Sequence, residues 1–130
     1  MTERPIDRGA LIAYLSLFAF HAAHVFEEVF GGFVVLQKIG LARFLAVNWL
    51  LFCIPLIFFY FWLRGRRWAH RLSALYAGFM VLNGLGHNLM TVATGRYFDG
   101  YAGGFSGIGL AVSGLILFVL LLRGDPGRSV

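Results

Sequence analysis

The chain contains little cysteine and few charged residues. Cys53 is its single cysteine, so the sequence excludes an internal disulfide and a thiolate metal cluster, and this residue is expected to serve as a small core hydrophobe. Only 13% of the residues are charged, and six of them are acidic. Such a composition is too apolar for a soluble domain of 130 residues and indicates a membrane protein.

Long hydrophobic runs account for most of the sequence. Residues 9–30, 44–63, 68–91 and 104–122 form four apolar segments, each about long enough to cross the hydrocarbon core of a bilayer. We therefore predict an all-α fold, a four-helix transmembrane bundle that forms one domain over residues 1–130. The first segment is too long for the apolar region of a signal peptide, so it is expected to be retained. Pro55 is expected to kink the second helix.

The basic residues flank the apolar segments and predict the orientation of the chain. The formal charge is +5, but this placement is what membrane topology requires, so no nucleic-acid partner is expected. With four spans, both termini and the second loop lie on the same side. That side has eight basic residues and the other has three, which places both termini in the cytoplasm. The eight are Arg4, Arg8, Arg64, Arg66, Arg67, Arg71, Arg123 and Arg128, and the three are Lys38, Arg43 and Arg96.

Four ionisable residues lie in the second half of the first apolar segment. They are His21, His24, Glu27 and Glu28. Ionisable groups at membrane depth cost a few kcal/mol each, so they usually face the protein interior and mark a site. At 100° per residue the four side chains fall within an arc of roughly 120° on one helix face. Imidazole and carboxylate groups on one rigid helix are suited to form half of a metal site.

The other polar residues are predicted to lie at the same depth, in the non-cytoplasmic third of the bundle. His70 is expected at the opposite interface. Each residue also has a simpler interpretation: asparagines often join helices, a histidine can be a packing residue, glutamates can face headgroups, and tyrosines can lie at the interface. Their common depth favours a site. The residues of this layer are Asn48, Asn83, His87, Asn88, Thr91, Tyr97, Asp99 and Tyr101.

The sequence resembles a known family at several of these positions. Residues 24–28 read H-x-x-E-E, His87-Asn88 lies late in the third segment, and a tyrosine-glycine loop precedes the fourth. In this layout the chain resembles the HXXEE family of small bacterial integral membrane proteins, whose function is uncharacterised. Gly103 replaces the proline usual in the family's loop. The resemblance implies a bacterial inner-membrane location and a joint role for His24, Glu27 and Glu28, but no reaction.

The first functional hypothesis is an intramembrane metal-dependent enzyme. The predicted ligands are His21, His24, Glu28 and His87. Their nitrogen and oxygen donors suit zinc most, and also iron or manganese. Glu27 is predicted to act as the general base or as an outer hydrogen-bond partner of the ligands, with the catalytic role favoured, and Asn88 is a second predicted catalytic residue. Substrate or ligands are expected to be oriented by Asn48, Asn83, Tyr97 and Tyr101.

The partners expected for such an enzyme are membrane lipid and a hydrophobic small molecule. A phenylalanine-lined site reached from the outer leaflet suits a lipid-like or isoprenoid-like substrate; a homo-oligomer is also left open. Three other functions remain alternatives at this point: a metal-free acid–base enzyme, a transporter for protons or divalent cations, and a b-type cytochrome. The cytoplasmic half offers few polar residues for a transport path, and two carboxylates beside a haem make the cytochrome the least favoured.

Overall fold

The computed structural model describes residues 6–96, 100 and 104–124, and these residues form helices and connecting turns. The helices are α1 (Arg8–Phe30), α2 (Val34–Ile39), α3 (Leu41–Leu63), α4 (Arg67–Thr94) and α5 (Phe105–Arg123). The prediction of an all-α chain is therefore confirmed for the described residues. The described part contains five helices, whereas the sequence predicted four. The additional helix is the six-residue α2.

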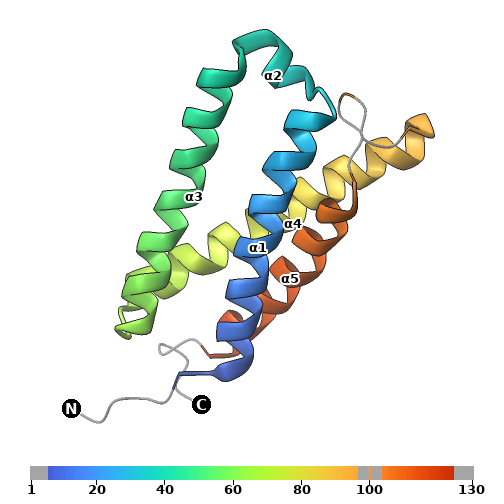
Figure 1. The fold of residues 1–130 in the computed structure, drawn as a ribbon. Coiled ribbons are helices and arrows are strands. Elements are labelled where there is room, and N and C mark those ends of the chain that lie inside the picture. Colours follow the sequence, from blue (N-terminus) through green and yellow to red (C-terminus); the bar gives the residue numbers. More distant parts are fainter. Residues whose placement is uncertain (1–5, 97–99, 101–103, 125–130) are drawn as a thin grey trace.

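Three helices, α1, α3 and α5, are long and apolar enough to cross a membrane. This agrees with the prediction of a membrane protein. The longest helix, α4, has 28 residues but is not one of these three, since it carries several polar side chains. Figure 1 shows the start of α1, the turn between α3 and α4, and the end of α5 at one end of the molecule, with α2 and the end of α4 at the other.

The local sequence explains where the helices begin and end. Asp7 caps α1, because its side chain accepts hydrogen bonds from the backbone N–H groups of Gly9 and Ala10 at 2.8 and 3.2 Å. Gly40 separates α2 from α3 with a φ of +80°, which lies in the region that favours glycine. The short α2 therefore turns the chain between α1 and α3.

The core lies among α1, α4 and α5. Its fully buried side chains include Tyr14 and Leu17 of α1, Met80 of α4 and Leu117 of α5. Helices α4 and α5 approach closely at Gly84, where an added Cβ would meet the backbone of α5. In contrast, α3 buries only Phe44 and Pro55, so it packs loosely against the other helices.

Candidate metal centre

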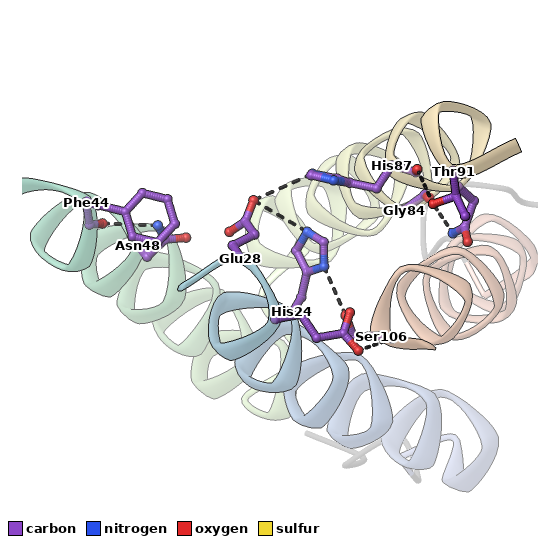
Figure 2. A network of polar contacts seen from close by, with 10 residues as sticks. His24, Glu28, Phe44, Asn48, Gly84, His87, Thr91 and Ser106 are labelled. Carbon is purple, nitrogen blue, oxygen red and sulfur yellow. Dashed lines mark hydrogen bonds and ion pairs between the residues drawn. The ribbon is translucent and has the colours of Figure 1, made fainter. Parts of the chain in front are cut away.

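Three predicted ligands meet near the end of α1. His24 and Glu28 lie one turn apart on α1, and His87 reaches them from α4 (Figure 2). Oε1 of Glu28 lies 3.6 Å from Nε2 of His24 and 3.5 Å from Nε2 of His87. Among the described residues, these three form a group whose potential ligand atoms all lie within 4.8 Å of one another.

The cluster is buried within the protein. His24 is 2% exposed and His87 is 8% exposed, and the Glu28 side chain is about nine-tenths buried. The two imidazole rings meet edge to face, with their centroids 4.6 Å apart, and the ring of Phe33 packs on His87. A carboxylate buried in this way needs a compensating positive charge or a proton.

Ser106 at the start of α5 joins His24 to Glu27. The backbone N–H of Ser106 donates to Oε1 of Glu27 at 3.0 Å, and its hydroxyl donates to Oε2 of the same carboxylate. On its other side, the hydroxyl oxygen lies 3.0 Å from Nδ1 of His24. The N–H group of Ser106 belongs to the first turn of α5, where N–H groups lack partners within the helix, so the carboxylate also satisfies the end of α5.

These hydrogen bonds determine which nitrogen of His24 carries the proton. The Ser106 hydroxyl has one proton and gives it to Glu27, so its oxygen must accept from Nδ1–H of His24. In a neutral imidazole, Nε2 then holds a lone pair. This buried Nε2 has no hydrogen-bond partner among the described residues and faces the Glu28 carboxylate. Two facing acceptors are unfavourable unless a cation or a proton lies between them.

The spacing of the cluster suits a tetrahedral zinc site. Zn–N and Zn–O bonds of about 2.0–2.1 Å at tetrahedral angles hold two ligand atoms about 3.4 Å apart. The two distances from Glu28 are 3.5 and 3.6 Å, close to this value, and all three ligand atoms lie within 4.8 Å of one another. Two histidines and one carboxylate would leave a coordination position open, as in catalytic rather than structural sites.

His21, the fourth predicted ligand, lies outside this group of three. Its Nδ1 is 3.0 Å from the hydroxyl oxygen of Tyr76, and its ring packs against Phe52. His21 is buried one turn before His24 and lines the neighbouring cavity. The structure therefore gives it a polar partner on α4 in place of a position beside Glu28.

A cavity of about 190 Å³ adjoins His24 and Glu28. It lies between α1, α3 and α4 and is bordered by α2. Two of the predicted substrate-orienting residues, Asn48 and Asn83, line it from α3 and α4. The amide nitrogen of Asn48 donates to the carbonyl oxygen of Phe44 at 3.0 Å (Figure 2). The other lining residues are His21, Phe33, Val35, Ile39, Phe44, Val47, Leu51, Phe79 and Met80.

The remaining predicted residues lie elsewhere. The amide of Asn88 donates to the carbonyl oxygen of Gly84 at 2.7 Å and packs against Gly107 of α5. Glu27 is held by Ser106, so neither predicted catalytic residue lines the cavity. Tyr97 and Tyr101 lie outside the described residues.

Sequence reasoning missed Ser106 and Tyr76, the partners of the two buried histidines on α1. Ser106 had one available signal: it lies just after Gly103 and Gly104, at the start of the fourth apolar segment and at the end of the bundle where Glu27 was expected. Tyr76 had no such signal, because it lies among apolar residues in the middle of the third segment.

Comparisons of the chain with models of known protein families, with curated proteins and with solved structures found no match. The functional argument therefore rests on the geometry and chemistry of the site.

Proposed function

We propose that the protein is a metal-dependent membrane enzyme in which His24, Glu28 and His87 bind one divalent cation. The observation that carries the proposal is the buried lone pair on Nε2 of His24, which has no hydrogen-bond partner among the described residues and faces a carboxylate. Zinc is the ion we propose, and iron or manganese are alternatives for the same donors. A zinc ion would supply Lewis-acid chemistry for hydrolysis or isomerisation of a substrate in the adjoining cavity, whereas oxidation would require iron or manganese together with an external oxidant.

The membrane arrangement is part of the same proposal. Helices α1, α3, α4 and α5 cross the bacterial inner membrane as a four-helix bundle with both termini in the cytoplasm. The cluster then lies in the non-cytoplasmic third, where a lipid-like or isoprenoid-like substrate can reach it. Membership of the HXXEE family also belongs to the proposal, with His24 and Glu28 of the motif as ligands.

We assign Glu27 a positioning role in place of the predicted general base. Its carboxylate accepts two hydrogen bonds from Ser106, and Ser106 contacts His24 on the side away from Glu28. This arrangement is suited to hold the His24 ring and its tautomer, as the outer hydrogen-bond partners of metal-binding histidines do. Asn88 has no contact of this kind, so its catalytic role stays a prediction.

Elemental analysis of the protein purified in detergent tests the metal. We expect one divalent ion per chain, and we expect its loss in His24→Ala and in His87→Ala. His70→Ala is the matched control, because His70 bonds the carbonyl oxygen of Leu121, away from the cluster, and should retain the ion. A metal-free wild-type protein after incubation with zinc would contradict the proposal and favour the metal-free acid–base alternative.

Removal of the metal should also lower thermal stability. An ion that binds only the folded state stabilises it by about 2.7 kcal/mol when its free concentration is 100 times its dissociation constant. We therefore expect a chelator to lower the Tm of the wild type and of His70→Ala, and to leave that of His24→Ala unchanged. An unchanged Tm in the wild type after verified metal removal would argue against a metal that joins α1 to α4.

A further inference from the structure

The cavity beside the cluster combines a few polar side chains with a mostly apolar lining, as ligand sites do. Its polar side chains come from three helices. They are His21, His24 and Glu28 of α1, Asn48 of α3 and Asn83 of α4. The remaining lining is apolar and includes Leu51 and Phe79. A ligand there would place a polar group near His24 and a hydrocarbon portion against these apolar side chains.

The cavity can hold the head of such a ligand. An engineered apolar cavity of about 150 Å³ binds benzene, so a volume of about 190 Å³ has room for a polar group and a short stretch of hydrocarbon. A longer chain would have to extend beyond the cavity. Val47 and Leu51 of α3 line the cavity and are 49% and 41% exposed, so the chain can extend outward on this side.

The charges around the cluster favour a neutral ligand. Two carboxylates, Glu27 and Glu28, lie at the cluster, and together they balance the two positive charges of the proposed cation. No lysine or arginine lies among the described residues that line the cavity. An anionic headgroup would therefore add a buried negative charge without a partner, which is costly at membrane depth.

The asparagines indicate the polar group. One N–H of the Asn48 amide is engaged by the carbonyl oxygen of Phe44, and its Oδ1 is an acceptor for a ligand hydroxyl. Asn83 offers both an amide donor and a carbonyl acceptor from the facing helix. A hydroxyl or carbonyl group can use these partners without carrying charge.

We propose that this cavity binds an uncharged amphiphile, a hydrocarbon with one hydroxyl or carbonyl group, and excludes phosphorylated and carboxylated lipids. The inference rests on the proposed function for its charge balance. Its place in the fold is independent of the metal, since the cavity is lined by α1, α2, α3 and α4 in the protein alone.

Photolabelling with a diazirine-bearing fatty alcohol tests the proposal on the protein in nanodiscs. We expect saturable labelling of peptides that contain Leu51, Phe79 or Met80. Unlabelled 1-dodecanol should compete at least tenfold more effectively than dodecanoate or dodecyl phosphate. Equal or better competition by the anions would overturn the neutral-ligand inference.

Two tryptophan variants, one that fills the cavity and one at the adjacent position, test whether the label binds in the cavity. Leu51→Trp should reduce labelling at least tenfold, whereas Leu50→Trp should not, because Leu50 is 59% exposed and does not line the cavity. Both variants should retain stoichiometric metal. Labelling that Leu51→Trp leaves unchanged would overturn the site.

Two further arms separate the inference from the proposed function and identify the source of the ligand. If the wild type is labelled specifically but binds no metal, the proposed metal site is wrong and the proposed ligand site is supported. If it binds metal but is labelled diffusely, the metal site is supported and the ligand site is wrong. A series of primary alcohols distinguishes the sources: competition that levels off near six carbons indicates a free small molecule, and competition that keeps rising indicates a membrane lipid.

Discussion

At the scale of single residues, the most informative contrast is between the two adjacent glutamates. Glu28 faces two imidazole nitrogens, while Glu27 turns to α5 and accepts two hydrogen bonds from Ser106. Neighbouring positions on a helix differ by 100°, so one residue can face the cluster and the next can hold a partner helix. The two glutamates of the H-x-x-E-E motif therefore have different partners: Glu28 faces the histidines, and Glu27 bonds to α5.

We predict that Glu28→Gln abolishes metal binding and that Glu27→Gln weakens it by 10- to 100-fold, the usual effect of losing an outer hydrogen-bond partner. In Glu27→Gln the amide can accept from only one Ser106 donor. The hydroxyl is then free to donate to Nδ1 of His24, which moves the proton to Nε2. Isothermal titration with zinc measures both affinities.

The tautomer of His24 serves as the control for Glu27→Gln, because a loss of packing alone would not change it. In the metal-free wild type the proton between Glu28 and His24 is expected on Glu28, so histidine ¹⁵N NMR should show Nε2 of His24 unprotonated, whereas in Glu27→Gln it should show Nε2 protonated. Unchanged affinity and an unchanged tautomer in this variant would contradict the positioning role.

At the scale of the helices, glycines let α4 and α5 approach. An added Cβ at Gly84 would meet the backbone nitrogen of Ala111 at 2.9 Å and Cβ of Leu110 at 3.1 Å, and would overlap the carbonyl oxygen of Gly107. The stretch of α5 from Gly107 to Ala111, little more than one helical turn, therefore lies directly on this glycine. The contact matters for the site, because α5 carries Ser106 and α4 carries His87.

We predict opposite effects of alanine at two nearby glycines of α4. Gly84→Ala should destabilise the protein by about 1–3 kcal/mol, since it overpacks the helix interface. Gly86→Ala should stabilise it by up to about 1 kcal/mol, because its Cβ meets no atom within 4 Å and alanine favours a helix. Unfolding in mixed detergent measures both, and equal effects at the two positions would contradict the close packing.

Much of the fold and part of the site could be predicted from the sequence. Apolar run lengths identify the long helices, and the four-residue spacing of His24 and Glu28 places them on one face. The sequence cannot give helix rotation and tilt, which decide that His21 meets Tyr76 while His24 meets Ser106. The short α2 lacks the length over which a helical period becomes visible.

At the scale of the whole molecule, the length of α4 and the distribution of its side chains are compatible with a membrane crossing. Its 28 residues span about 42 Å at 1.5 Å per residue, which exceeds a hydrocarbon core of about 30 Å. Its polar side chains Ser73 and His87 are buried inside the protein. The exposed face instead presents Leu75, Leu82 and Leu89, at 67%, 71% and 67% exposure and seven residues apart. Such a stripe is suited to contact lipid, so the polar residues do not prevent a crossing.

We predict that α4 crosses the membrane and that the two ends of the bundle lie on opposite sides. Reporter fusions truncated after Gly65 and Gly95 flank α4 and test this directly. With both termini in the cytoplasm, a fusion after Gly65 should give fluorescent GFP and inactive alkaline phosphatase, and a fusion after Gly95 should give the reverse. Fusions after Gly40 and Val130 are the controls, with Gly40 expected outside the cytoplasm and Val130 inside. If Gly65 and Gly95 report the same side, α4 does not cross; His87 would then have to reach the cluster from a helix that lies along the surface, and the proposed intramembrane site would be wrong.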